Sequence, residues 1–177
     1  MTTQHAVRRS DRAQDDSWIR DFLSRAAFGQ VAFVSDGQPY INANIFVYDE
    51  AQHAIYLHTA HLGRTPGALE EPSEVCFSTS EMGRLLPAYE AREFSVEYRS
   101  VTVFGRARIV RDQEQARAAL HLLLDKYAPH LQRGQDYLAV TDEELKYTAV
   151  YRIDIDQWSG KAKQVAEDFP GAFWYQG

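Results

Sequence analysis

Polar and apolar residues alternate with a period of two along much of this chain, which is the pattern of half-buried β-strands. This alternation, or a short β-branched and aromatic run, occurs in six segments: 31–34, 40–48, 55–59, 74–79, 94–110 and 147–155. Two further segments, which begin near residues 15 and 112, repeat apolar residues at helical spacing. The pattern predicts a mainly β protein of about six strands, with one helix before them and one late in the chain.

Both predicted helices have recognisable ends. Asp15 is a suitable N-cap for the first helix, and Gly29 is expected to end it. The apolar face of this helix consists of Trp18, Ile19, Phe22, Leu23 and Ala26. Asp112 with Gln115 resembles a capping box before the second helix, which Pro129 stops. Each helix therefore has an apolar face to bury against the sheet.

The connections between the strands favour an antiparallel sheet. Asp36-Gly37 lies between two β-rich runs and predicts a hairpin, and Gly105 is the natural bend in the long segment 94–110. The chain lacks a regular β-α-β alternation, a GxGxxG motif and a Walker motif, so a dinucleotide-binding doubly wound sheet is excluded. We expect one domain over residues 1–177, a small closed or split β-barrel with peripheral helices. Residues 1–14 would form an N-terminal arm and residues 162–177 a C-terminal tail.

Charge and composition narrow the function classes. The chain has 177 residues and a formal net charge of -6, which argues against a nucleic-acid-binding protein. No apolar stretch approaches membrane-spanning length, and the N-terminus lacks the apolar middle of a signal peptide. The single cysteine, Cys76, lies in an apolar run and is expected to be a buried structural thiol. These features predict a soluble, cytoplasmic protein that contacts neither nucleic acid nor membrane.

The segment 54–71 carries the best candidate for a phosphate site. Its strand ends in His58-Thr59, and Gly63-Arg64 follow just before a short predicted helix. Gly63 lets the backbone approach an anion, backbone N–H groups at the start of the helix can donate to it, and Arg64 offers a bidentate fork. An ordinary strand–turn–helix connection explains the same residues equally well.

The strand predicted over residues 40–48 has two different faces. Ile41 and Ala43 begin one face, which is expected to point into the core, while Asn42 and Asn44 lie among aromatic residues on the other. Amides beside aromatic rings suit the edge of a planar heteroaromatic ligand. The alternative is a solvent-exposed face that carries asparagine.

His58 is the best candidate for a catalytic side chain; Tyr98 and Tyr56 are further candidates, but aromatic strand residues usually serve packing. Imidazole titrates near neutral pH and can donate or accept a proton, but a strand histidine bonded to backbone is an equally good explanation. Together with His61 it also allows a haem or metal protein. This alternative is the weakest, because two histidines at a strand end without a Cys/His cluster are a poor metal signature. We therefore expect no metal site.

The order of the motifs is similar to a known family. The motifs are His58-Thr59, Gly63-Arg64, the strand YRSVTVFG over 98–105, the late helix, and Trp158-x-Gly160-Lys161. This order resembles the FMN-binding split barrel of the pyridoxamine 5′-phosphate oxidase-like proteins. The segments RRSDR, DGQPY, IYLHTAHLG and YRSVTVFGRARIV are most similar to the flavin-nucleotide-binding group that includes nitroimidazole-resistance proteins. The likeness spans roughly Arg8 to Lys161.

The resemblance implies a homodimer with two FMN sites at the subunit interface. By position, Arg64 would hold the FMN phosphate together with the hydroxyl of Thr59 and the backbone around Gly63. The strand that carries Asn42 and Asn44 would run along the isoalloxazine ring. A flavin needs cations at its phosphate and polar partners at its ring edge, so these residue types suit it.

The resemblance also assigns residues later in the chain to the flavin site. Arg99 and Ser100 would reach the flavin from the long strand, and Trp158 and Lys161 would close the site from the C-terminal side. A lysine that serves as a second phosphate ligand in the family is Thr65 here. This departure is expected to weaken flavin affinity.

The C-terminal sequence separates this chain from true pyridoxamine phosphate oxidases. After the Trp-Gly-basic motif those enzymes continue with an arginine- and histidine-bearing segment that binds pyridoxal phosphate. This chain reads AKQVAEDFPGAFW there and has no arginine or histidine. The resemblance therefore implies an FMN-dependent oxidoreductase acting on a small planar acceptor such as a nitroaromatic. A flavin-binding sensor or carrier without catalysis would use the same binding residues, and the sequence leaves both open.

Overall fold

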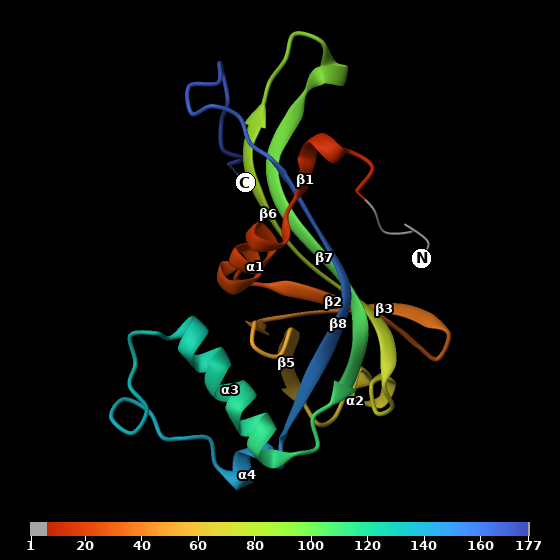
Figure 1. Cartoon of the computed structure of the whole chain (residues 1–177), viewed down its shortest axis with the longest axis vertical. Coiled ribbons are helices and arrows are strands. Elements are labelled where there is room, and N and C mark those ends of the chain that lie inside the picture. Colours follow the sequence, from red (N-terminus) through yellow and green to blue (C-terminus); the bar gives the residue numbers. More distant parts are fainter. Residues whose placement is uncertain (1–6, 177) are drawn as a thin grey trace.

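The computed structural model describes residues 7–176 as a sheet with peripheral helices (Figure 1). The helices are α1 (Asp16–Arg25), α2 (Arg64–Ala68), α3 (Gln113–Tyr127) and α4 (Asp142–Leu145). The strands are β1 (Ala13–Gln14), β2 (Gly29–Ser35), β3 (Gln38–Asn44), β4 (Val47–Asp49), β5 (Ala54–Ala60), β6 (Ser73–Leu86), β7 (Ser95–Ile109) and β8 (Thr148–Lys163). This arrangement confirms the mainly β fold. No helix among these residues is long and apolar enough to cross a membrane.

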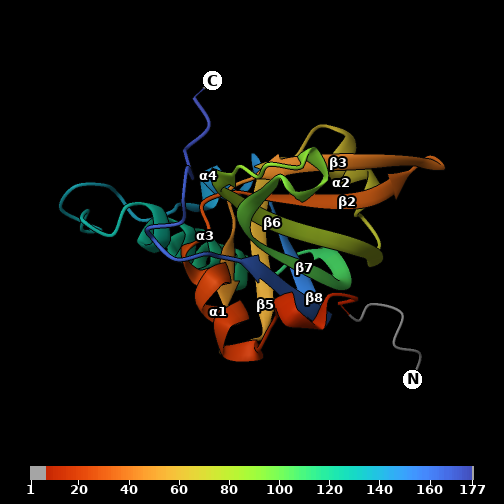
Figure 2. The same ribbon diagram turned by 90° about the horizontal axis from the view of Figure 1, so that it is seen from above.

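All strands of the described chain join one antiparallel sheet. Its order is β3-β2-β6-β7-β8-β5-β4, and β1 pairs with β8. The β2–β3 hairpin projects on the side opposite α3 in both views (Figures 1 and 2). As predicted, Asp36-Gly37 makes its turn, and both residues have positive φ, 52° and 76°, as a type I′ turn requires. The sheet is the antiparallel split barrel that the sequence predicted.

Helix α1 packs on the main core. The Asp15 carboxylate accepts a hydrogen bond from Trp18 N at 2.8 Å and so caps the helix, as predicted. Ile19, Phe22 and Leu23 are fully buried and join a core formed by β2 and β4–β8. The expectation that Gly29 ends the helix was wrong: the C-cap is Ala26.

Helix α3 forms a second layer outside the sheet. Asp112 accepts from Gln115 N at 2.7 Å, which confirms the predicted cap. The buried face of α3 packs on β5 and β8 in a separate apolar cluster: Val47, Ala54, Tyr56, Val110, Ala116, Ala119, Leu123, Leu145 and Val150. Lys126 Nζ donates to the carbonyl oxygens of Ala26 at 2.8 Å and Phe46 at 3.0 Å, which joins α3 to the end of α1 and the start of β4.

The single strand predicted over residues 40–48 is two strands, and its faces are reversed. Strand β3 ends at Asn44 and β4 begins at Val47. Asn42 lies opposite the core residue Val31, so its side chain points inward, because directly paired residues of an antiparallel ladder share a face. Ile41 is 64% exposed on the outer face, so the expectation that it points into the core was wrong.

Strands β6 and β7 are longer than the sequence indicated and rise together beyond the rest of the sheet (Figure 1). The strand predicted over residues 74–79 runs from Ser73 to Leu86. The register between β7 and β8 shifts between Phe104 and Gly105, which confirms the bend predicted there. A second shift in β6, between Met82 and Leu85, lies near the base of this projecting hairpin, which we call the β6–β7 arm.

Candidate functional site

Side chains of β3 bridge the open edge between β3, at one end of the strand order, and β5, which is next to last at the other end. Asn44 Nδ2 donates to the carbonyl oxygen of His58 on β5, and Asn44 Oδ1 accepts from Ile45 N at 2.8 Å. Asn42 Nδ2 donates to Thr65 Oγ1 in α2 at 3.0 Å. The two asparagines therefore hold the seam of the split barrel. Each amide nitrogen, predicted as part of a ligand-facing side chain, thus donates one hydrogen bond within the chain.

Arg64 opens a groove next to this seam. The groove has a volume of about 550 Å³ and is lined by Val34, Ser35, Asp36, Gly63, Arg64, Gly67 and Ala68. The Arg64 guanidinium lies 4.9 Å from the centre of the Tyr40 ring, and within residues 7–176 it forms no ion pair. Gly63 has φ 139°, a region that favours glycine, and a Cβ there would meet only Pro66 at 4.0 Å. Arg64 thus has no anionic partner among residues 7–176, and the backbone of Gly63 beside it is uncrowded. Such an arrangement is suited to an anionic ligand group.

The departure at Thr65 has a structural explanation. Thr65 is buried, and its hydroxyl accepts the hydrogen bond from Asn42. A lysine at this position would have to bury its ammonium group under α2 or turn it out into the groove. Threonine instead links α2 to β3, so the cation of this groove is Arg64 alone.

His58 and Thr59 point to opposite faces of the sheet, as neighbours in a strand do. Thr59 faces the main core, where its hydroxyl lies 3.2 Å from Tyr151 OH. His58 pairs with Val150 and faces the α3 layer. Burial lowers the pKa of His58 and keeps it neutral, and its buried Nδ1 has no hydrogen-bond partner among the described residues. The two residues are therefore neighbours in sequence without sharing a surface.

A second group of predicted cofactor residues lies where the first half of β7 pairs with the end of β8: Arg99, Ser100 and Lys161. Ser100 is directly opposite Lys161, so the two side chains share the outer face. Arg99 points to the other face, where its guanidinium lies 3.6 Å from Glu81. No described contact joins these residues to the Arg64 groove. One chain therefore separates the predicted cofactor residues into two groups.

Trp158 belongs to neither group. Its side chain packs on the core face under α1, and its Nε1 donates to Asp16 Oδ1 at 2.8 Å. The ring contacts His53 at 4.6 Å between centroids, and the Arg20 guanidinium lies 5.4 Å above it. Within one chain Trp158 thus fixes α1 to the sheet and is not placed to close the Arg64 groove.

The histidine and cysteine candidates for metal binding do not converge. His61 Nε2 lies 3.2 Å from the carbonyl oxygen of Leu145, the last residue of α4. Cys76 was expected to be buried, and it is only half-buried, on the outer face. Among residues 7–176 no group of three or more His, Cys, Asp or Glu side chains is arranged for a metal ion.

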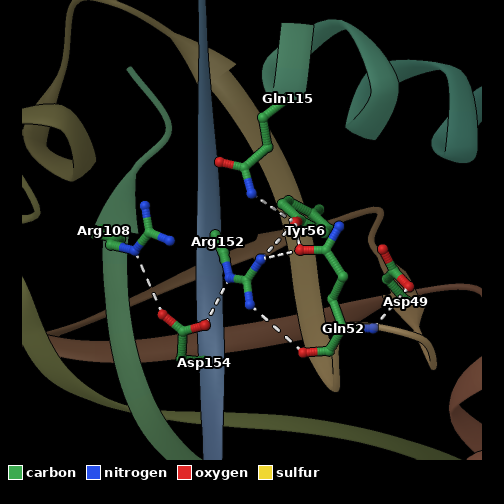
Figure 3. Close-up of polar contacts among 7 residues, drawn as sticks. All are labelled: Asp49, Gln52, Tyr56, Arg108, Gln115, Arg152 and Asp154. Carbon is green, nitrogen blue, oxygen red and sulfur yellow. Dashed lines mark hydrogen bonds and ion pairs between the residues drawn. The ribbon is translucent and has the colours of Figure 1, made fainter. Parts of the chain in front are cut away.

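A polar network ties α3 to the sheet at a place that sequence analysis did not single out (Figure 3). Arg152 Nη1 donates to Tyr56 OH at 3.0 Å, and Gln115 Nε2 of α3 donates to the same oxygen at 3.2 Å. Arg108 is directly opposite Arg152 across β7 and β8, and Asp154 accepts from both, at 3.4 and 2.6 Å. Asp154 thus offsets the repulsion of two paired cations, and the network holds α3 in place.

The architecture and the sequence agree with one family. Residues 15–162 match the family described as pyridoxamine 5′-phosphate oxidase. The chain belongs to the pyridoxamine 5′-phosphate oxidase family. The match ends within β8, so the C-terminal segment from residue 163 lies outside the part that defines the family. Among curated proteins, none is similar enough to match the sequence.

Solved structures of the same fold are similar over most of the chain. The flavocytochrome Anf3 from Azotobacter vinelandii has a TM-score of 0.79 and 24% identity, covering 100% of this chain and 86% of its own. The FAD and haem binding protein from Mycobacterium smegmatis has a TM-score of 0.77 and 25% identity, covering 87% and 74%. A candidate 5-nitroimidazole antibiotic resistance protein from Bacteroides thetaiotaomicron has a TM-score of 0.68 and 23% identity, covering 85% and 89%.

Sequence analysis missed a second cleft, which the C-terminal segment forms with the β6–β7 arm. Arg84 and Glu97 lie on adjacent strands of the arm and form an ion pair at 2.8 Å, and Arg84 Nη1 donates to the carbonyl oxygen of Glu167 at 2.7 Å. The residues that line this cleft come from three distant parts of the sequence, so no local motif predicts it. The presence of Phe173, Trp174 and Tyr175 in a polar tail was the only available signal.

Proposed function

We propose that this protein binds FMN, with the phosphate held by Arg64 in the groove beside Gly63. The observation that carries the proposal is the Arg64 guanidinium, which has only the Tyr40 ring as a partner within the described chain. A phosphate would give it a bidentate ionic partner. Ser35 also lines the groove and can donate a hydroxyl hydrogen bond. Asp36 lines the same groove, so a bound phosphate would have to lie on the Arg64 side of it.

The names of structural relatives support a flavin. One is a flavocytochrome and another an FAD and haem binding protein. We prefer FMN to FAD on the resemblance of the motif order to FMN-binding split barrels. The finer assignment of Asn42 and Asn44 to the ring edge changes in one respect: one N–H of each amide donates in the seam, which leaves the second N–H and the amide oxygen of Asn42 to face a ligand.

We also propose that two copies of the chain form each flavin site. Arg99, Ser100 and Lys161 are separated from Arg64 within one chain, so only a second copy can bring them to the same flavin. The outer face of the β2–β3 hairpin supplies an apolar surface for such a dimer, because Val34 and Ile41 there are 62% and 64% exposed. Burying side chains of this kind favours association.

The proposed activity is oxidation–reduction of a small planar acceptor such as a nitroaromatic compound. A bound flavin would supply the redox chemistry, and the protein would orient the flavin and exclude water. His58 stays the predicted proton donor or acceptor, through the unpaired Nδ1. The C-terminal segment lacks arginine and histidine after Lys161, so we do not assign pyridoxamine phosphate oxidation to this chain.

Flavin loading tests the proposal directly. The purified protein is incubated with FMN, passed through a gel-filtration column and scanned from 300 to 600 nm. We expect about one FMN per chain to elute with a dimer. Protein that elutes without FMN at micromolar concentrations contradicts the proposal. Loaded protein is then mixed with NADH or NADPH and a panel of nitroaromatics and quinones, and turnover separates an oxidoreductase from a flavin-binding sensor or carrier.

A further inference from the structure

The Arg84–Glu97 ion pair of the β6–β7 arm also holds the C-terminal segment, and we call this arrangement the clamp. The Glu97 carboxylate accepts from Arg84 Nε at 2.8 Å, from Arg84 Nη2 at 3.0 Å and from Val165 N at 2.9 Å. Arg84 also donates to the carbonyl oxygens of Ala166 and Glu167, at 3.1 and 2.7 Å. Because Glu97 has these donors on all sides, it serves the clamp and is not available to a ligand.

The β6 register shift aims Arg84 at this position. Such a shift re-aims a side chain relative to a regular ladder. Gly83 lies within it, and a Cβ there would come within 2.8 Å of Glu97 Cβ, so glycine lets the two strands approach. Farther along, Phe173 N donates to the Leu85 carbonyl oxygen at 3.1 Å, and Leu85 N donates to the Phe173 carbonyl oxygen at 2.7 Å. The segment is thus fixed at two points along the arm.

Between these two points the segment and the arm enclose a cleft of about 300 Å³. Its lining is Glu81, Met82, Gly83, Arg84, Glu97, Tyr98, Arg99, Gln164, Val165, Glu167 and Trp174. The Trp174 side chain is 64% exposed at the edge of this cleft. The volume is at the lower end of small-molecule sites, which is enough for one aromatic ring and too small for a dinucleotide.

We infer that this cleft binds a neutral single-ring aromatic compound that carries a nitro or similar oxygen-bearing group. Trp174 and Tyr98 offer ring faces, and Met82 offers a polarisable sulfur for an aromatic ring. Arg99 offers the donor for the oxygen group. Its side chain is 35% exposed and lies 3.6 Å from Glu81, too long for a strong hydrogen bond, so it can turn to a ligand.

The charges of the cleft favour a neutral ligand over an ionic one. Arg84 and Glu97 neutralise each other, and Arg99 is close to Glu81. Glu167 adds a further carboxylate to the lining. An anionic ligand would meet this carboxylate, and a cationic ligand would meet two guanidinium groups. A nitro group has partial negative charge on oxygen without a net charge, which suits Arg99.

The inference rests on the proposed function for its biological meaning: Arg99 is also predicted to approach the flavin, so the cleft would hold the acceptor that the flavin reduces. The binding itself needs no flavin and is tested on the protein without FMN. The probe is 4-nitrobenzyl alcohol, and benzyl alcohol is the matched compound without the nitro group. Dissociation constants are measured by ligand-observed NMR titration.

Two pairs of variants make the test specific. Trp174→Ala removes the ring at the cleft, and Tyr175→Ala removes its neighbour, which is 65% exposed but does not line the cleft. Loss of one aromatic stacking contact is expected to weaken binding of 4-nitrobenzyl alcohol about tenfold in Trp174→Ala and to leave Tyr175→Ala unchanged. Arg99→Gln should remove most of the preference for the nitro compound, while Arg92→Gln, on the exposed tip of the arm, should retain it.

The outcomes separate this inference from the flavin proposal. No binding of 4-nitrobenzyl alcohol, or equal effects of Trp174→Ala and Tyr175→Ala, overturns the cleft assignment. Displacement of the probe by FMN at one equivalent per chain also overturns it, because the cleft would then belong to the flavin. If the probe binds as described but FMN does not bind at all, the cleft stands and the flavin proposal fails.

Discussion

Asn42 Nδ2 donates to the hydroxyl of Thr65 at 3.0 Å, and this one bond joins strand β3 to the residue that follows Arg64. Together with the bond from Asn44 to the carbonyl oxygen of His58 on β5, it links β3 across the open edge of the barrel. Because it fixes the first turn of α2 against β3, it also determines where the Arg64 guanidinium lies over the Tyr40 ring. The seam of the barrel and the proposed phosphate site therefore share the Asn42–Thr65 bond.

A double-mutant cycle measures this bond. Asn42→Ala and Thr65→Val should each lower the free energy of unfolding by about 1–3 kcal/mol, since each leaves a polar group inside without its partner. The coupling energy between them should be about 1 kcal/mol. Urea unfolding of the wild type, the two single variants and the double variant gives the cycle. Additive effects would mean that the bond contributes nothing in solution.

Two glycines with different surroundings test the packing at the β7–β8 bend. A Cβ at Gly105 would lie 2.1 Å from the backbone oxygen of Asp154, which cannot move without breaking the ladder. Gly105→Ala should therefore cost at least about 2 kcal/mol of stability. Gly67→Ala is the control, because nothing lies within 4 Å of a Cβ there. Similar unfolding midpoints for the two variants would contradict the bend as described.

The ion pair of the clamp predicts acid sensitivity. The Arg84 guanidinium, with the N–H of Val165, lowers the pKa of Glu97 to about 2, against an unfolded value near 4.5. Between these values the unfolded chain binds more protons than the folded one, so stability falls as pH drops through this window. Glu97→Gln should be less stable than the wild type at pH 6, and the difference between the two should shrink toward pH 2. A constant difference across this range would exclude the assigned pKa.

Lys126 predicts a slope of the same sign at alkaline pH. Its ammonium group is half-buried among backbone carbonyls, and burial lowers its pKa to about 8. Between pH 8 and the unfolded value near 10.4 the unfolded chain holds the extra proton, so this residue's contribution to stability rises with pH. The wild type should therefore gain stability relative to Lys126→Met between pH 8 and pH 10, measured by denaturant titration. Tyrosine ionisation affects both proteins and cancels in the difference.

Local sequence signals predicted the parts of the fold that depend on neighbours in the chain. The Asp15 and Asp112 caps, the Asp36-Gly37 turn and the bend at Gly105 are each set by a few adjacent residues, and each was found as predicted. Alternation alone could not decide which face of β3 is inward. Polarity alone favours Ile41 inside and Asn42 outside. The structure has the reverse, because the Asn42 amide points inward and donates to Thr65 across the seam.

The site was harder to predict, because its geometry depends on contacts between distant segments. Gly63 and Arg64 are adjacent in sequence, and their groove could be anticipated. The motif that contains Trp158 gives the order of residues but not which side of a strand they occupy, and within one chain Trp158 lies on the core face under α1. The cleft at Trp174 depends on Arg84 and Glu97, which lie 90 and 77 residues before it in the sequence and carry no shared pattern.

The phosphate-binding role of Arg64 is the central claim, and one comparison tests it most directly. Isothermal titration calorimetry measures the affinities of FMN and riboflavin, which differ only in the phosphate, for the wild type and for Arg64→Gln. Loss of a charged hydrogen-bonded pair should weaken FMN binding about 10- to 100-fold and leave riboflavin binding unchanged. Equal effects of the substitution on both ligands, or no effect on either, would contradict the account.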